Sequence, residues 1–124
     1  MRPKKHPHAT AQRWPGRSFE TFPPKSLDAS FHLWDTVHAL APLNPRFISV
    51  TYGAGGSTQS LTQEAAQTLR KSSGLPVAAH LTCTGQTRAE VLRTASRFAA
   101  SGIDHIVALR GDAPNGDAFE PHPD

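Results

Sequence analysis

Ionisable and hydroxyl side chains recur toward the carboxyl ends of four short apolar segments of this sequence. They are Glu20, Thr51, His80, Thr82, Arg110 and, two residues further on, Asp112. Carboxyl and imidazole groups donate and accept protons in catalysis, and guanidinium groups bind anionic ligands. If the fold brings these segment ends together, we expect one site for ligand binding and acid–base chemistry.

Glu20 is the strongest candidate for a proton donor. It stands between aromatic residues and precedes the rigid pair Pro23-Pro24. A carboxyl group in such a setting is expected to be desolvated, which favours its protonated form and suits a general acid. The alternative is an ion pair with Arg110 or Lys25, and the sequence alone leaves both interpretations open.

A glycine run, "VTYGAGGST", joins the second apolar segment to a helical pattern. A phosphate-binding loop of the G-x-x-x-x-G-K-[ST] type needs a lysine that is missing here. The spacing of Gly53, Gly55 and Gly56 does not fit G-x-G-x-x-G either. The run is therefore a flexible turn before a helix, or a place where the backbone closely approaches a ligand. The segment by itself supports both interpretations equally.

His80 and Cys83 lie three residues apart, so in a strand they point to opposite faces and make a poor metal pair. We expect no metal site, and we expect Cys83 to be a small buried residue. A lone histidine in a strand is commonly a hydrogen-bonded structural residue. The face that His80 shares with Glu20 and Arg110 favours a ligand-binding role instead.

Apolar and amphipathic segments alternate from residue 18 onward, which predicts strands alternating with helices. We expect strands at 18–22, 47–52, 75–83 and 105–111, and helices at 26–42, about 58–71 and 87–101. The order β-α-β-α-β-α-β is typical of parallel βαβ units with right-handed crossovers.

The helix boundaries have their own signals. Pro42 and Pro45 end the first helix, Gly74 follows the second, and the T-x-x-E pattern from Thr87 to Glu90 is a capping box for the third. The spacing in the first helix predicts one face made of Leu27, Phe31, Trp34, His38 and Ala41.

Strand side chains alternate between two faces, so the position of a residue predicts its face. The counting places Glu20, Thr51, His80, Thr82 and Arg110 on one face and mostly apolar residues on the other. A doubly wound sheet would have apolar residues on both faces, whereas a (β/α)8 barrel has its active site at the carboxyl-terminal mouth. In the last strand the same counting groups Arg110 with Ile106 and Ala108. We predict an α/β fold, a partial (β/α)8 TIM barrel of about four βα units.

A complete barrel of this type has about 250 residues, and this chain has 124. We expect a basic, flexible leader at 1–17 and the N-terminal half of a (β/α)8 domain at 18–124. A half barrel alone would expose two edge strands and part of its apolar interior. We therefore expect a fragment, or a chain whose second half comes from another polypeptide.

The charge of the chain is concentrated in its leader. Residues 1–17 contain five of the 13 basic residues and no acidic one. Such an arm could bind nucleic acid, but no second basic patch with interleaved aromatics follows, so we expect no nucleic-acid partner. The sequence has no long apolar run and no secretory pattern. With Cys83 as its single cysteine, it predicts a cytoplasmic protein that does not associate with membranes.

Four phrases in order, "SFETFPPK", "FISVTYGAGGST", "AHLTCTGQTRAE" and "GIDHIVALRGD", resemble the N-terminal half of the methylenetetrahydrofolate reductase family. The resemblance covers roughly residues 17–114. It implies a flavin-dependent (β/α)8 enzyme of one-carbon and methionine metabolism that reduces 5,10-methylenetetrahydrofolate to 5-methyltetrahydrofolate. NADH or NADPH reduces FAD in this family, and the reduced flavin passes the hydride to the folate.

The resemblance also implies roles for individual residues. Glu20 matches the general acid that protonates the folate and opens its five-membered ring to an iminium. Asp112 matches a residue near the flavin N1 edge and the pterin, and so bears on both flavin and folate. The positions that match the flavin and nicotinamide site are Thr51, Tyr52, Ala54, His80, Arg110, Gly111 and Asp112.

The sequence departs from the family pattern in two places. The residue after the catalytic glutamate is Thr21 instead of phenylalanine, and alternation points it away from the site, so we expect this change to affect packing. The chain also stops after the fourth predicted strand. The alternative to an enzyme is therefore a non-catalytic half-barrel fragment or subunit that needs a complementary chain. As partners we expect the folate substrate and either a second copy of the chain, in a homo-oligomer, or a complementary half-barrel chain.

Overall fold

The computed structural model describes residues 16–52, 59–103 and 105–113, together with residues 118, 120 and 123. The elements occur in the order β-α-β-α-β-α-β, with one short 3-10 helix, η1, after the first α-helix. Their bounds are β1 Ser18–Thr21, α1 Leu27–Leu40, η1 Ala41–Leu43, β2 Phe47–Val50, α2 Gln59–Ser73, β3 Val77–Thr82, α3 Arg88–Ala100 and β4 His105–Leu109. This order confirms the predicted alternation, although each strand is shorter than its predicted range.

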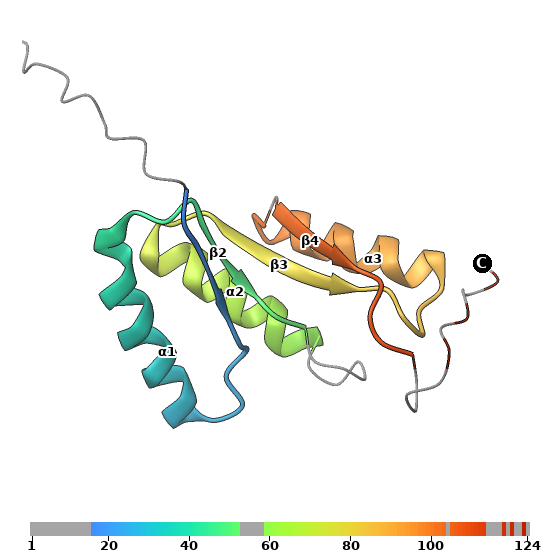
Figure 1. Cartoon of the computed structure of the whole chain (residues 1–124), viewed down its shortest axis with the longest axis horizontal. Coiled ribbons are helices and arrows are strands. Elements are labelled where there is room, and N and C mark those ends of the chain that lie inside the picture. The colour runs from blue at the N-terminus through green and yellow to red at the C-terminus, as the bar shows by residue number, and fades with distance from the viewer. Residues whose placement is uncertain are drawn as a thin grey trace, which may run out of the picture.

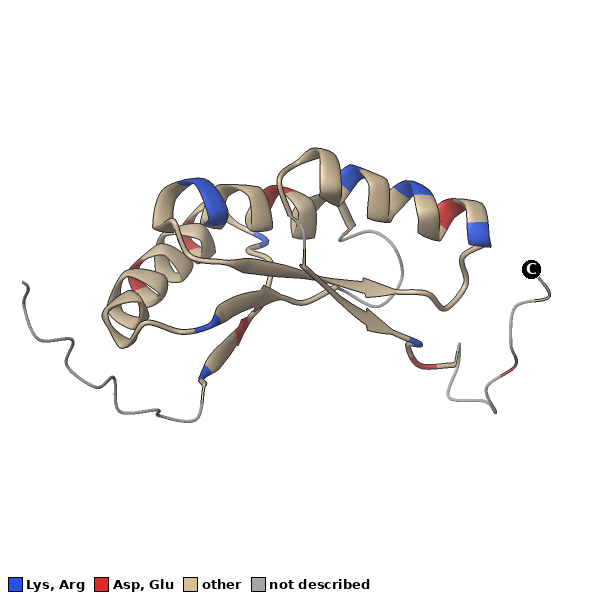
Figure 2. Cartoon of the chain, turned by 90° about the horizontal axis from the view of Figure 1, so that it is seen from above, with Lys and Arg blue, Asp and Glu red and all other residues tan. Residues whose placement is uncertain are grey.

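The strands form one four-stranded parallel sheet in the order β1-β2-β3-β4 (Figure 1). All three α-helices cover the same face of this sheet, and no helix of the described residues covers the opposite face, which is called the open face below (Figure 2). A doubly wound sheet would carry helices on both faces. The described elements therefore form consecutive βα units wound in one direction around a single sheet, and the carboxyl ends of all the strands lie at one edge.

Local caps mark the ends of the helices, and those at Thr87 and Gly74 were predicted. Ser26 caps α1, because its hydroxyl accepts a hydrogen bond from the Ala29 amide at 3.1 Å. The capping box of α3 is present in full: the Thr87 hydroxyl accepts from the Glu90 amide, and the Glu90 carboxylate accepts from the Thr87 amide. Gly74 follows α2 with φ of +68°, a backbone conformation that favours glycine.

The core lies between the sheet and its helices. Alternate residues of the two central strands point toward the helices and are almost fully buried. They pack against Val37 of α1, Leu69 of α2 and Phe98 of α3. The strand residues of this cluster are Ile48, Val50, Val77, Ala79 and Leu81. The apolar face predicted from alternation in β2 and β3 is therefore confirmed.

The predicted face of α1 was wrong. Leu27 and Phe31 are 72% and 59% exposed. The helix contacts the core through Val37 and Leu33, which lie four residues apart on another side of the helix. The helix contains more apolar positions than one face can hold, and the geometry of the β1–α1 turn decides which of them meet the sheet.

The predicted faces of the fourth strand were also wrong. In the sheet register, Ala78 pairs with His105 and His80 pairs with Val107. Paired residues of neighbouring strands point to the same face, so Val107 and Leu109 lie on the face of His80. Ile106 and Ala108 lie on the helix-covered face, and Arg110 follows the strand beyond its last residue.

No helix within the described residues is both long and apolar enough to cross a membrane.

Candidate active site

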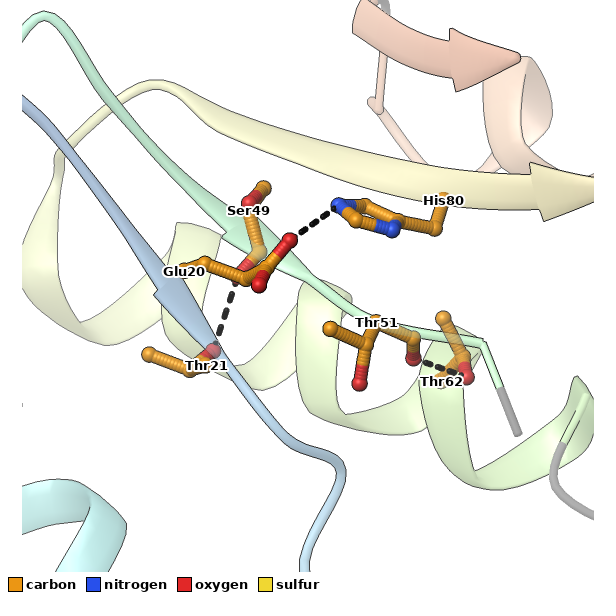
Figure 3. A network of polar contacts seen from close by, with 6 residues as sticks. All are labelled: Glu20, Thr21, Ser49, Thr51, Thr62 and His80. Carbon is orange, nitrogen blue, oxygen red and sulfur yellow. Dashed lines mark hydrogen bonds and ion pairs between the residues drawn. The ribbon is translucent and has the colours of Figure 1, made fainter. Parts of the chain in front are cut away.

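The open face of the sheet brings Glu20 and His80 together. Glu20 is on β1 and His80 on β3, and their side chains point toward one another across β2 (Figure 3). His80 Nε2 lies 3.3 Å from Glu20 Oε1, an ion pair whenever the imidazole is protonated. The His80 side chain is only 8% exposed, whereas that of Glu20 is 58% exposed. One member of the pair is thus fixed in the sheet, and the other faces the open side.

This geometry corrects two expectations about Glu20. Its carboxyl group is not desolvated, because more than half of the side chain is exposed. Its partner is His80, and neither Arg110 nor Lys25 forms the predicted ion pair with it within the described residues. The aromatic neighbours do not cover Glu20, because Phe22 is itself 74% exposed.

Thr21, the residue that departs from the family pattern, points away from this site. It is 7% exposed, and its hydroxyl donates a hydrogen bond to the backbone carbonyl of Ser49 at 2.9 Å (Figure 3). The prediction that Thr21 bears on packing is therefore confirmed. The hydrogen bond of this buried hydroxyl joins β1 to β2.

Polar contacts hold the end of β2 in place. The Thr51 amide donates to the Thr21 carbonyl at 2.9 Å, and the Thr51 carbonyl accepts from the hydroxyl of Thr62 on α2 at 2.9 Å. The next residue, Tyr52, accepts at its hydroxyl a hydrogen bond from Gln86 Nε2 at 2.9 Å. Thr62 and Gln86 were missed by the sequence reasoning, and no short-range signal could have found them because their partners are 11 and 34 residues away.

The segment after β4 is tied to the end of β3. The Thr84 amide donates to the Arg110 carbonyl at 2.9 Å. Gly111 has φ of +86°, and a Cβ atom built on it would come within 2.5 Å of Thr82 Cγ2. Only glycine fits this turn without strain. The turn carries the chain from Arg110 to Asp112, both of which are exposed.

The predicted site residues therefore divide into three groups. Glu20 and His80 are in contact. Thr51 and Tyr52 follow the end of β2, and Arg110, Gly111 and Asp112 follow the end of β4, at the same edge of the sheet. Ala54 lies outside the described residues. Cys83, expected to be buried, is only partly so. Among the described residues, no three His, Cys, Asp or Glu side chains come together as a metal site.

The arrangement can hold and deliver a proton. In the described part of the chain Glu20 Oε1 contacts the imidazole, and Oε2 makes no polar contact with protein. A carboxyl group fixed at one oxygen and open at the other suits transfer of a proton to a bound molecule. Together with the one-sided parallel sheet, this defines an α/β protein whose candidate site lies toward the carboxyl ends of the strands.

The chain belongs to the methylenetetrahydrofolate reductase family, whose model matches residues 5–124. It is 43% identical over 97 residues to the 5,10-methylenetetrahydrofolate reductase of Pectobacterium carotovorum, an alignment that covers 78% of this chain and 33% of that protein. The Salmonella typhimurium reductase is 42% identical over 99 residues, which cover 80% and 33%. A relative in Arabidopsis thaliana, methylenetetrahydrofolate reductase (NADH) 1, is 37% identical over 80% of this chain and 17% of its own length. The chain thus spans about a third of the length of its curated bacterial relatives.

Proposed function

We propose that this chain carries the acid residue and part of the ligand site for reduction of 5,10-methylenetetrahydrofolate to 5-methyltetrahydrofolate, with NADH or NADPH as the hydride source. Membership of the family supports the substrate, because the relatives bear its name. The observation that carries the proposal is Glu20: a partly exposed carboxyl on the open face of the sheet, with one oxygen held by His80.

We also propose that the described sheet is half of a (β/α)8 barrel. Its strands run parallel in sequence order, and its helices cover one face only. The open face would then be the inside of the barrel, where active-site residues gather at the carboxyl ends of the strands. The longer relatives have room for four further units, which would pair with the open edges of β1 and β4.

The residues present fit a flat flavin ring system, and we propose FAD as the cofactor. The ends of β2, β3 and β4 form a row about 10 Å long, comparable to a three-ring system. Thr51 lies at one end of this row and Gly111 at the other. The Nδ1 atom of the buried His80 has no protein partner in the described part of the chain and is available to a ligand. When bound, the flavin supplies hydride transfer between the nicotinamide and the folate.

The chain's own groups supply the proton and the electrostatics. Glu20 would donate from Oε2 to a ring nitrogen of the folate, so that the five-membered ring opens and its carbon becomes electrophilic. The proton leaves the carboxyl group, which becomes a carboxylate beside the His80 imidazole. Asp112, carried outward by the Gly111 turn, would place negative charge beside the ligands and so disfavour additional negative charge there.

FAD binding tests this proposal. The purified chain, incubated with FAD and desalted, should retain flavin absorbance, and the bound flavin should bleach when NADH or NADPH is added. Replacement Asp112→Asn should change the rate of bleaching without abolishing retention, because only the charge is altered. The exposed Asp35 on α1 offers a matched control, and Asp35→Asn should leave both properties unchanged. Loss of all flavin on desalting, at every protein concentration, would contradict a site built on these residues alone.

A further inference from the structure

His80 is the most buried ionisable side chain near the open face. It lies on β3, which pairs with β2 on one side and with β4 on the other, and its side chain is 8% exposed. Burying an imidazole costs free energy that polar partners must offset. Its one protein partner among the described residues is the Glu20 carboxyl, at Nε2. The ring orientation is therefore set by packing in the sheet, and one nitrogen is directed at Glu20.

The contact depends on two small residues between the partners. β1 and β3 are separated by β2, a distance of about 10 Å between the strand axes. In the sheet register Glu20 is opposite Ser49, and Ser49 is opposite Ala78, so His80 lies two residues further along β3. The Glu20 side chain has to cross the position of Ser49 to reach it (Figure 3). Ser49 and Ala78 leave the space that a larger residue would fill.

The contact between Glu20 and His80 orients the Glu20 side chain more than it stabilises the fold. Glu20 is 58% exposed, and ion pairs between exposed side chains contribute little to the stability of a protein. A free glutamate side chain samples several rotamers, and fixing it in one of them costs conformational entropy. A contact with a buried, immobile imidazole restricts Glu20 to the rotamers that place Oε1 at the ring. Oε2 then faces the open side of the sheet.

We propose that His80 is a positioning residue for Glu20, an inference that rests on the acid role proposed for Glu20 above. The imidazole engages Oε1, so that Oε2 is the oxygen that meets the substrate. This role is additional to ligand binding, because it uses Nε2 and leaves Nδ1 for a ligand. Ser49 and Ala78 contribute to this role, because their small side chains leave the path between Glu20 and His80 open.

The contact can be tested without turnover by nitrogen NMR of the imidazole rings in the 15N-labelled chain. The His80 resonances are assigned by their loss in His80→Gln. A carboxyl oxygen that accepts a hydrogen bond at Nε2 favours a proton on that nitrogen, so the Nε2 signal should be that of a protonated nitrogen. It should shift in Glu20→Gln and in Glu20→Ala. The matched control is Glu64→Gln on α2, an exposed carboxyl on the helix-covered side of the sheet, which should leave the signal unchanged.

Two results would overturn the proposal. The first is a His80 spectrum that is the same in the wild type and both Glu20 variants, with amide spectra showing that all three are folded. The second is a proton found on Nδ1 alone in the wild type, because Nε2 would then have none to share with a carboxylate. Neither result bears on whether the chain binds FAD or reduces folate, so failure of this inference is distinguishable from failure of the proposed function.

Kinetics of the FAD-loaded protein separate positioning from packing. His80→Leu should lower kcat for folate reduction by about 100-fold, the order expected when a catalytic group is misplaced by about 1 Å. His80→Gln keeps a polar group that can reach Glu20 and should restore most of the rate. Flavin retention is measured in both variants, so that loss of cofactor is not mistaken for loss of positioning. Equal kcat in His80→Leu and the wild type would contradict the role.

Discussion

At the scale of single residues, Gly111 decides where Asp112 lies. Its φ of +86° is strained for any residue with a Cβ atom, and that atom would come within 2.5 Å of Thr82 Cγ2. Two separate costs therefore oppose substitution. The backbone conformation costs about 1 to 2 kcal/mol, and the overlap with Thr82 costs about 1 to 3 kcal/mol more.

We predict that Gly111→Ala lowers the free energy of unfolding, measured in urea, by the sum of these two costs. The matched control is Gly74→Ala, since Gly74 has φ of +68° and nothing within 4 Å of an added Cβ atom. Its free energy of unfolding should fall by the cost of the backbone conformation alone. Adding Thr82→Ser to Gly111→Ala removes the methyl group with the closest contact and should recover most of the difference, because Thr84 Cβ, at 3.0 Å, stays near the added atom. Equal losses in Gly111→Ala and Gly74→Ala would contradict the steric account.

Residue patterns predicted which side chains could meet, but not which do. Alternation correctly placed Glu20 and His80 on one face, because period two holds in any strand. It could not give their contact, which depends on the register of three strands and on the small size of Ser49. It failed for Arg110, because the count was extended past Leu109, where the strand ends, and because the pairing of β4 with β3 is not encoded locally.

At the scale of elements, α2 holds the end of β2 through one buried hydroxyl. Thr62 is fully buried and donates to the Thr51 carbonyl at 2.9 Å. Only Tyr52 stands between Thr51 and the glycine run in the sequence. This hydrogen bond therefore fixes the end of β2 that leads to the glycine run. We predict that Thr62→Val, which has nearly the same shape, lowers the free energy of unfolding by about 1 kcal/mol, the loss of one hydrogen bond to a partly buried carbonyl.

The control for this change is Thr62→Ser, which keeps the hydroxyl and should cost less than Thr62→Val in the same urea titration. Hydrogen exchange gives a second measurement. The Thr51 amide, which donates to the Thr21 carbonyl, should exchange faster in Thr62→Val. A valine variant as stable as the wild type would show that the hydroxyl does not hold the strand end.

Element order and helix ends could be read from the sequence because their signals are local. The capping box at Thr87, the prolines after α1 and the glycine after α2 each act within one helical turn. The buried face of α1 could not be read from the sequence. Leu27 and Phe31, which are exposed, are as apolar as the residues of this helix that contact the core. Only the path of the chain between β1 and α1 selects among them.

At the scale of the whole molecule, the described sheet has two open edges. β1 pairs only with β2, and β4 pairs only with β3, while Ile106 and Leu109 on β4 are 38% and 41% exposed. The curated bacterial relatives are about three times as long as the segment they share with this chain. We expect the proposed reaction to require a complementary polypeptide that covers these edges, so activity is measured with and without one.

The most direct test compares folate reduction by the wild type and Glu20→Gln. The purified chain is supplied with FAD, NADH or NADPH, and 5,10-methylenetetrahydrofolate, both alone and mixed with the remaining segment of the Salmonella relative. We predict folate-dependent NAD(P)H oxidation by the wild type in at least one of these mixtures. We predict a loss of about 100-fold or more in Glu20→Gln, with flavin reduction by NAD(P)H retained. Equal folate turnover in the two proteins, or none by the wild type in any mixture, would contradict the proposed function.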